Sequence, residues 1–467
     1  MSNRTIAGLG TLFSLLFLVL VARQFFVQVV EAPSIAARPY NPRRGLLASG
    51  RGEILASDGA VLARSVSGKR IYPMGRSLAQ TVGYVSDRYG TSGIEAAYDR
   101  ALSPAESTGD IGEQIQEIVD AFHGKSPEPR GANVVTTIDP PIQAELFAQL
   151  SQHARGAGVV LDPRTGAVLA IASVPSFDPN ALDAAFPSLR QNPESPLLNR
   201  AIDGLYPPGS TFKLVTAGAA LDSGTFTMHS RFYDPGYITI GRFRLHNAGH
   251  EITGWQNITG AFALSVNVDF AQIALKMGAD TFYEYMHRWG LGDTLDFQLP
   301  AQRDSIPPKS SITPGELAQM GFGQGALLMT PLQMALIAST IANRGVEPRP
   351  YIVREVVRAG GGSSFGPATL AEPVSADTAR DVKKMMVAVV ERGTGTTAAL
   401  PGVTVAGKTG TATNPFGAPH SWFVCFAPAD HPRVAVAIVV ENAGYGAAVA
   451  APIARDVLRV ALQSVRS

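Results

Sequence analysis

Two strand–turn–strand patterns, one early and one late in the chain, constrain the fold more than any other feature of this sequence. Apolar residues 158–161 and 167–171 flank a short turn that begins at Asp162-Pro163. Residues 420–426 and 434–440 flank a second turn that begins at Pro428. Connections this short join neighbouring antiparallel strands. Both patterns therefore predict antiparallel hairpins.

The long segment between these hairpins has a mostly helical pattern. Residues 211–221 and 331–343 are its clearest helices, and a last helix is expected at 452–463, with Pro452 in its first turn. Strands from both ends with helices between them require a sheet that is completed late in the chain. We therefore expect an α/β fold in which helices flank an antiparallel sheet.

The length of 467 residues is too great for one ordinary domain. Before the first hairpin, residues 45–130 form short strand-like pieces with glycine turns, and Ser57-Asp58-Gly59 is typical of a hairpin turn. Nothing in this portion has a catalytic pattern. We expect three parts: residues 1–31 as a cytoplasmic tip and transmembrane anchor, 32–135 as a small β-rich pedestal, and 136–467 as the large α/β domain.

The N-terminal anchor is predicted from residues 6–22, an uncharged apolar run flanked by Arg4 and Arg23. A spanning helix needs roughly 20 apolar residues, and this run gains length if Arg23 extends toward the lipid headgroups. The run is long for a signal peptide, although Ser34-Ile35-Ala36 offers a cleavage site. Either outcome puts the rest of the chain beyond a membrane.

Charge and cysteine content remove some classes of function. Lys and Arg total 39 against 38 for Asp and Glu, a net charge of +1, so there is no electrostatic case for a nucleic-acid partner. The single cysteine, Cys425, lies in an apolar run and is expected to be a buried small hydrophobe. His250 and Glu251 lack metalloprotease spacing and are interpreted as loop residues. No metal or other cofactor is expected.

The first chemical motif is Ser210-Thr211-Phe212-Lys213, which follows Pro207-Pro208-Gly209. The prolines and glycine predict a turn that puts Ser210 at a helix N-terminus, where free N–H groups favour developing negative charge. The spacing of three puts Lys213 on the same helical face as Ser210. Burial would favour the neutral amine, which could take the proton of Ser210. The alternative is a serine cap followed by a surface lysine.

Two further motifs accompany the first. Ser265-Val266-Asn267 lies in an apolar stretch, where a buried hydroxyl and amide must find partners, or act simply as helix caps. Lys408-Thr409-Gly410-Thr411 lies on a strand-like run. Its cation and hydroxyls suit a substrate carboxylate, and Gly410 would let an extended ligand approach the strand closely. The alternative is an edge-strand lysine beside a glycine bulge.

In this order, the three motifs resemble those of the penicillin-binding proteins and serine β-lactamases. The resemblance runs from about Arg51 to the C-terminus. Arg51-Gly52-x-Ile54 and Gly93-Ile94-Glu95 are similar to the pedestal signatures of class B penicillin-binding proteins, and Thr136-Thr137-Ile138-Asp139 is similar to the start of their transpeptidase domain. The short pedestal and residues 206–213 most resemble the actinobacterial penicillin-binding protein A group. Asp269 is less typical.

This resemblance implies a penicillin-binding transpeptidase fold, including an all-helical subdomain, and a peptidoglycan D,D-transpeptidase activity. Ser210 would attack the D-Ala-D-Ala end of a stem peptide, with Lys213 as base and the N–H groups of Ser210 and Thr411 as oxyanion hole. Ser265 and Lys408 would pass a proton to the departing D-Ala. Asn267 would bind a substrate amide, and Thr409, Gly410 and Thr411 would bind the rest of the substrate.

The implied partners are the stem peptide, β-lactams, the cell membrane and a membrane glycan polymerase. The implied location is a single-pass membrane protein with an extracytoplasmic catalytic domain, working in growth or division. Two alternatives stay open. In the first, the protein is a β-lactamase or D,D-carboxypeptidase, in which water accepts the acyl group. Carboxypeptidase activity is also compatible with a transpeptidase, as a side activity. A non-catalytic scaffold or antibiotic sensor would keep the fold, although Ser210, Lys213 and Lys408 argue for catalysis.

Overall fold

The structure is a computed structural model that describes residues 50–104, 131–358, 361–415 and 417–465, together with residues 13, 16, 17, 19, 20 and 23. Most of the apolar run at residues 6–22, on which the predicted anchor rests, lies outside the described residues. Among the residues that are described, no helix has the length and apolar character to cross a membrane.

The core of the large domain is a five-stranded antiparallel sheet with the order β17-β18-β19-β7-β8. Both hairpins predicted from the sequence are confirmed as β7–β8 and β18–β19. Between them, β19 pairs with β7 and so joins the C-terminal hairpin to the early one. The strands are β7 (Gly156–Leu161), β8 (Val168–Val174), β17 (Ala406–Ala412), β18 (His420–Ala427) and β19 (Val434–Val440).

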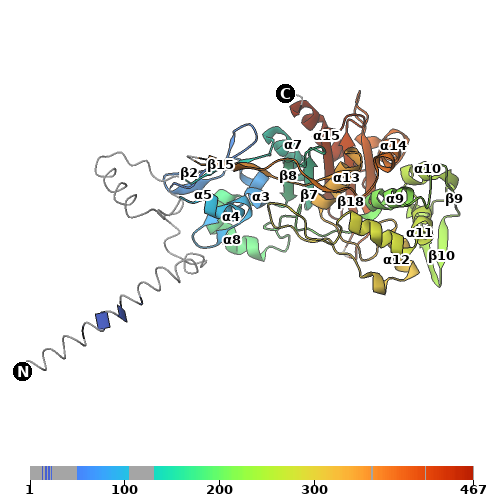
Figure 1. The fold of residues 1–467 in the computed structure, drawn as a ribbon, viewed down its shortest axis with the longest axis horizontal. Helices are drawn as coiled ribbons and strands as arrows, with labels where there is room; N and C mark the ends of the chain where they lie inside the picture. The colour runs from blue at the N-terminus through green and yellow to red at the C-terminus, as the bar shows by residue number, and fades with distance from the viewer. Residues whose placement is uncertain are drawn as a thin grey trace, which may run out of the picture.

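Helices cover both faces of this sheet, because its strands are apolar on both sides. Trp422, Val424 and Phe426 pack in the same cluster as α9 (Lys213–Asp222) and α13 (Pro331–Ala342). Phe423 and Cys425 pack on the other face, against α7 (Pro140–Leu150) and α15 (Ala450–Ser464). Cys425 is thus a buried core residue, as predicted. Figure 1 shows this layered part of the molecule around β7, β8 and β18.

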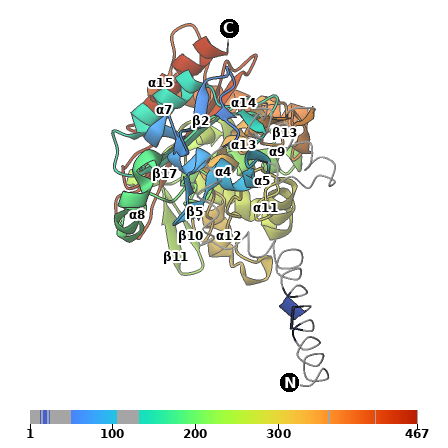
Figure 2. The same cartoon turned by 90° about the vertical axis from the view of Figure 1, so that its left-hand side faces the viewer.

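The part of the chain that carries the remaining helices also contains four short strands, paired as one hairpin and one separate two-stranded ribbon, so the expectation of an all-helical subdomain is wrong. Its strands alternate exposed and buried residues, as in β9, where Phe232 and Asp234 point inward. The strands are β9 (Arg231–Asp234), β10 (Tyr237–Ile240), β11 (Phe243–His246) and β12 (Gly254–Asn257). The β10–β11 hairpin extends away from the body of the domain (Figures 1 and 2). The helices are α10 (Ile258–Ala263), α11 (Asn267–Arg288), α12 (Pro314–Met320) and α14 (Ala376–Arg392).

The N-terminal part is built on a six-stranded sheet with the order β15-β14-β6-β1-β2-β3. The turn at Asp58 joins β1 to β2 as predicted, and the Asp58 side chain accepts a hydrogen bond from the Ala60 N–H. Two of the strands, β14 and β15, come from the segment that the sequence assigns to the large domain. The strands are β1 (Ile54–Leu55), β2 (Val61–Val66), β3 (Lys69–Ile71), β6 (Asn133–Thr136), β14 (Val353–Arg358) and β15 (Gly361–Ser364).

Short elements complete both parts. The helices are α3 (Ala79–Val82), α4 (Gly93–Ala97), α5 (Asp99–Leu102) and α8 (Leu182–Gln191), and the strands are β4 (Val85–Ser86), β5 (Gly90–Thr91), β13 (Glu347–Pro348) and β16 (Thr369–Ala371).

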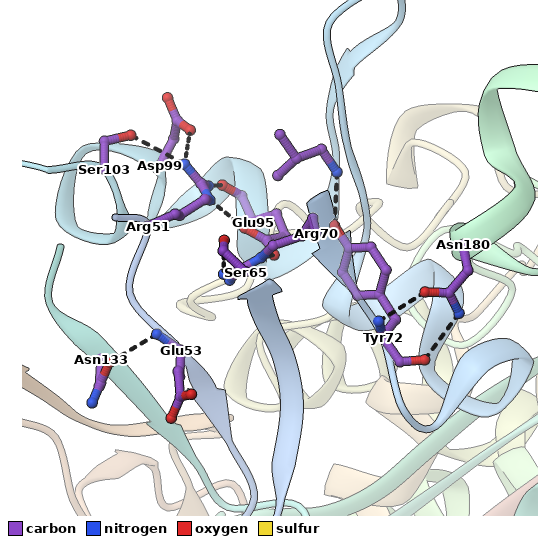
Figure 3. A network of polar contacts seen from close by, with 11 residues as sticks. Arg51, Glu53, Ser65, Arg70, Tyr72, Glu95, Asp99, Ser103, Asn133 and Asn180 are labelled. Atoms are coloured by element: carbon purple, nitrogen blue, oxygen red, sulfur yellow. Dashed lines mark hydrogen bonds and ion pairs between the residues drawn. The ribbon is translucent and has the colours of Figure 1, made fainter. Parts of the chain in front are cut away.

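A buried charge cluster holds the N-terminal part together (Figure 3). The Glu95 carboxylate lies between two arginines, with Arg51 Nε at 2.7 Å and Arg70 Nε at 2.6 Å. Arg51 also donates to Asp99 and to the Ser103 hydroxyl. The side chains of Glu95, Arg51 and Arg70 are almost wholly shielded from solvent. Because each charge has a partner, the cluster fixes how the start of β1 meets α4 and α5.

Candidate active site

Ser210 lies in the 3-10 turn Gly209–Phe212 that leads directly into α9. Gly209 has a positive φ of 53°, and a Cβ there would meet Ala412 and the Thr411 carbonyl at 3.1 Å. The loop before the turn is held by the Trp422 indole, which donates to the Pro207 carbonyl at 3.0 Å. In a 3-10 turn residues i and i+3 eclipse each other, so Ser210 and Lys213 lie on one side. The predicted position of Ser210 at a helix start is confirmed.

Lys213 is fully buried, and its amine contacts the second motif. Its Nζ donates to the Ser265 carbonyl at 2.6 Å and to Asn267 Oδ1 at 2.8 Å, and lies 3.3 Å from Ser265 Oγ. No hydrogen bond between Lys213 and Ser210 is found among the described residues. A neutral amine has two N–H donors and one lone pair. With both donors committed to oxygen acceptors, the lone pair of Lys213 is left for a proton.

The second lysine approaches the same hydroxyl from β17. Lys408 is also fully buried, and its Nζ lies 2.8 Å from Ser265 Oγ and 3.1 Å from the Thr409 carbonyl. Ser265 therefore bridges the two amines. The bridge depends on a turn between α10 and α11, in which Ser265 has a φ of 62°, unusual for a residue with a side chain. Backbone strain of this kind often accompanies a functional site.

Burial shifts the protonation of both lysines toward the neutral form. Desolvation lowers the pKa of Lys408 from 10.5 to about 7. The pKa of Lys213 is lowered well below 10.5, first by burial and then by repulsion from Lys408, while Asp269 acts in the opposite direction. Two buried cations so close to one hydroxyl would repel each other, so the site favours at most one charged lysine. This arrangement suits proton transfer near neutral pH.

The third motif forms the edge of the sheet, since β17 is its outermost strand. The β17–β18 register runs without a shift from Ala406 to Ala412, so the alternative of a glycine bulge is wrong. A Cβ at Gly410 would meet Thr211 Cγ2 at 2.9 Å and the Pro208 carbonyl at 3.1 Å. The loop that carries Ser210 thus approaches the backbone of Gly410 closely.

A pocket of about 710 Å³ joins these groups. Five of the predicted site residues line it: Ser210, Ser265, Asn267, Thr409 and Thr411. Lys213 and Lys408 lie buried beneath it, in contact with Ser265. Thr409 Oγ1 lies 2.5 Å from Thr394 Oγ1, which also lines the pocket. The volume is typical of a site for a small substrate.

Asn247 is a site residue that the sequence analysis missed. Its side-chain oxygen accepts from the N–H groups of Asn267 and Val268 at 2.9 and 3.0 Å, so it caps the start of α11. Its amide nitrogen donates to the buried Asp234 carboxylate at 2.7 Å. The same carboxylate accepts a hydrogen bond from the Thr253 N–H. No spacing pattern singles out Asn247, because the contact depends on how the chain after the β10–β11 hairpin returns to α11. Nearby, burial raises the pKa of Asp269 to about 6.

His250 and Glu251 lie in a loop after β11, as the sequence predicts. Glu251 lines the pocket, whereas the sequence analysis gave it no functional part.

Comparisons with known proteins agree with this geometry. Residues 156–459 match the family described as the penicillin binding protein transpeptidase domain, and residues 51–134 match the penicillin binding protein A dimerisation domain. The chain is 35% identical over 502 residues to the peptidoglycan D,D-transpeptidase PbpA of Mycolicibacterium smegmatis, with 99% of each chain covered. It is 30% identical to the peptidoglycan D,D-transpeptidase MrdA of Escherichia coli, over 82% of this chain and 69% of the relative.

Solved structures give the same result. The D,D-transpeptidase domain of a peptidoglycan glycosyltransferase from Eggerthella lenta superposes with a TM-score of 0.80 at 36% identity, covering 89% of this chain and 99% of the other. The penicillin G acyl-enzyme complex of penicillin-binding protein A from Mycobacterium tuberculosis also has a TM-score of 0.80, at 34% identity, covering 89% of this chain and all of the other.

Proposed function

The chain belongs to the penicillin-binding protein transpeptidase family, and from this membership we infer that it is a peptidoglycan D,D-transpeptidase that forms its acyl-enzyme on Ser210. The role of Ser210 as nucleophile is supported by the groups around it. Ser210 opens into the same pocket as Ser265, whose hydroxyl bridges two buried lysines.

Acylation begins when Ser210 transfers its proton to neutral Lys213 and its Oγ attacks the penultimate D-Ala carbonyl. The C–Oγ bond forms while the oxyanion accepts hydrogen bonds from the N–H groups of Ser210 and Thr411. Proximity supports this step, because the 3-10 turn puts Ser210 and Lys213 on one side. Lys213 is already oriented by Ser265 and Asn267, so little reorganisation is needed.

The peptide bond breaks when the departing D-Ala nitrogen gains a proton. Ser265 donates that proton and is resupplied by Lys408, at 2.8 Å from its hydroxyl. The hydroxyls of Thr409 and Thr411 hold the carboxylate of the departing D-Ala, since both line the pocket on β17. Asn267 has a double part: its side-chain oxygen orients Lys213, and its amide nitrogen remains to bind the substrate.

Deacylation completes the cross-link. An amine from a second stem peptide attacks the ester carbonyl, the new C–N bond forms, and the C–Oγ bond breaks. The amine loses a proton to the site, and Ser210 regains one from Lys213. A β-lactam follows only the first half of this cycle, because its leaving nitrogen stays tethered to the acyl group.

We also propose that the protein acts outside the cytoplasmic membrane, anchored through residues 6–22, with residues 32–135 as pedestal and 136–467 as catalytic domain. The apolar run between Arg4 and Arg23 supports the anchor. A membrane glycan polymerase is the partner that the resemblance to class B penicillin-binding proteins implies. Fractionation of cells that carry a tagged chain, with protease added outside the membrane, tests the orientation.

The test of the nucleophile is the substitution Ser210→Ala, followed by a fluorescent penicillin and mapping of the labelled peptide. The variant is expected to lose covalent labelling completely, because no other group forms the ester. Ser188→Ala, at an exposed serine on α8, is the matched control and should label normally. Normal labelling of Ser210→Ala would refute the assignment. An acyl-enzyme that decays within minutes would favour a hydrolase instead.

A further inference from the structure

One exposed surface next to the pocket has no part in the reaction described so far. Tyr237 lies opposite His246 in the β10–β11 register, and Arg244 lies two pairs further along the hairpin, on the same face. The Arg244 guanidinium lies 5.0 Å from the Tyr237 ring centre. The Tyr237 and His246 rings are 5.8 Å apart, and those of His246 and His250 are 4.7 Å apart. We call these four residues the basic row.

The basic row leads into the pocket that contains Ser210. His246 belongs to both, because it lines the pocket together with Asn247 and Glu251. All four side chains of the row are exposed, whereas Leu245, on the other face of β11, is buried. The hairpin is therefore anchored on one face and open to solvent on the other. Figures 1 and 2 show it extending outward from the domain.

The exposed charge of this region is positive, although the whole chain is almost neutral. Residues 231–257 include Arg231, Arg242 and Arg244 against two acids, Asp234 and Glu251. Asp234 is buried and saturated with hydrogen bonds, so only Glu251 opposes the three exposed arginines. Among the ion pairs of the described residues, none involves Arg242 or Arg244. A local excess of unpaired cations concentrates anionic ligands.

Two groups among the residues that line the pocket bear on where the second substrate binds. Thr409, Thr411 and Thr413 come from β17 and the residue after it, where the donor peptide and its carboxylate are expected to bind. The other group, from His246 to Thr253, follows the basic row. A transpeptidase needs space for a second peptide, whose amine must reach the acyl group on Ser210. The expected donor position on β17 leaves the hairpin side of the pocket for that second peptide.

We propose that the basic row is the subsite for the acceptor stem peptide, and that Arg244 binds a carboxylate of that peptide while its amine attacks the Ser210 ester. This inference rests on the transpeptidase function proposed above. Tyr237 orients the guanidinium by stacking beneath it, and His246 carries the contact surface into the pocket. The row selects an anionic acceptor peptide in preference to water or a neutral amine.

The test measures how the acyl-enzyme divides between two acceptors. A small D-alanyl thioester acylates Ser210, and a synthetic stem peptide with a free amine and free carboxylates competes with water. The ratio of cross-linked to hydrolysed product is set after acylation, so it depends neither on the acylation rate nor on the folded fraction. Arg244→Glu is expected to lower this ratio by about two- to fivefold, the size of a single exposed charge interaction.

Two controls sharpen the result. Arg459→Glu makes the same charge change on α15, which packs on the face of the sheet opposite to α9, and should leave the ratio unchanged. The same stem peptide with its carboxylates amidated should give equal ratios with the unmodified protein and with Arg244→Glu. Added salt should reduce the advantage of the anionic acceptor in the unmodified protein.

An unchanged ratio in Arg244→Glu, or an equal loss with the amidated acceptor, would overturn the acceptor subsite while leaving Ser210 acylation intact. Failure of the unmodified protein to form any acyl-enzyme would instead refute the transpeptidase function, and the subsite with it. Tyr237→Ala provides a second variant that keeps Arg244 but removes its support. It should lower the ratio in the same direction, and a normal ratio would count against the row.

Discussion

At the scale of single residues, the site depends on two lysines, Lys213 and Lys408, whose pKa values are lowered by burial. Lys213 must be neutral to accept the proton of Ser210, whereas Lys408 must carry a proton to resupply Ser265. The two requirements are compatible only if the lysines titrate differently. Repulsion from Lys408 lowers the pKa of Lys213 further, which favours this division of roles.

The rate of acylation by penicillin should therefore have a bell-shaped pH profile. Acid pH protonates Lys213 and slows the attack, and pH above about 7, the pKa to which burial lowers Lys408, removes the proton needed for the leaving group. Stopped-flow measurements with a fluorescent penicillin from pH 5 to 9 would show it. A rate that still rises at pH 9 would contradict the charged role of Lys408.

Folding stability should respond to pH differently from the rate. The folded pKa of Lys408 is about 7 and its ordinary value is 10.5, so between these limits the unfolded chain binds more protons. Stability attributable to this lysine therefore rises as the pH increases from about 7 to 10.5. At neutral pH the buried Lys408 amine lowers the free energy of unfolding. The pH at which acylation is fastest therefore lies below the pH at which Lys408 destabilises the fold least.

At the scale of elements, the start of α11 is the critical junction. Its first N–H groups are capped by Asn247, which follows the β10–β11 hairpin. The same helix start carries Asn267, which orients Lys213. The segment of short strands is thus connected, through the start of α11, to the proton acceptor, although it contributes no group that reacts.

Replacing Asn247 with alanine should therefore affect both stability and acylation. Loss of the cap is expected to cost about 1–2 kcal/mol, and displacement of Asn267 should slow acylation by penicillin. Asn257→Ala is the matched control, because the Asn257 side chain caps α10 in the same region through the Gly260 N–H. It should lower the melting temperature but leave acylation at its normal rate. Equal acylation rates in the two variants would show that Asn247 only stabilises the fold.

The sequence predicts what is local and misses what depends on distant contacts. The two hairpins, the helix start at Ser210 and the burial of Cys425 follow from patterns within a few residues. The contacts of Lys213 with Ser265 and Asn267, and the cap from Asn247, join segments that are remote in the chain. Propensities carry no information about such contacts, so the short strands inside the helical part and the packing role of Gly410 were missed.

At the scale of the whole molecule, two structural units share one sheet. β14 pairs with β6 and β15 pairs with β14, so the N-terminal sheet is completed by residues that follow α13 in the chain. Thr137 reinforces the junction, since its hydroxyl donates to the Val168 carbonyl on β8 at 2.6 Å. The N-terminal part and the catalytic part should therefore unfold together.

A substitution far from the active site tests this coupling. Glu95→Gln removes the charge between Arg51 and Arg70, which leaves Arg51 with Asp99 alone and the buried Arg70 without its carboxylate partner, at a cost on the order of 3 kcal/mol. The temperature at which the protein loses its capacity to bind penicillin should fall together with its calorimetric melting temperature. Asp87→Ala, at an exposed acid of the same part, is the control. Two separate calorimetric transitions, with penicillin binding surviving the first, would contradict the coupling.

The shared sheet also limits how such proteins can diversify. A gene segment that encodes only the N-terminal residues specifies four of the six strands. The other two, β14 and β15 at one edge of the sheet, are encoded far downstream. Recombination that exchanged the N-terminal segment alone would pair a foreign β6 with the original β14. The side chains of these two strands would not have been selected to pack together. Inheritance of the two units as one block is the expected outcome.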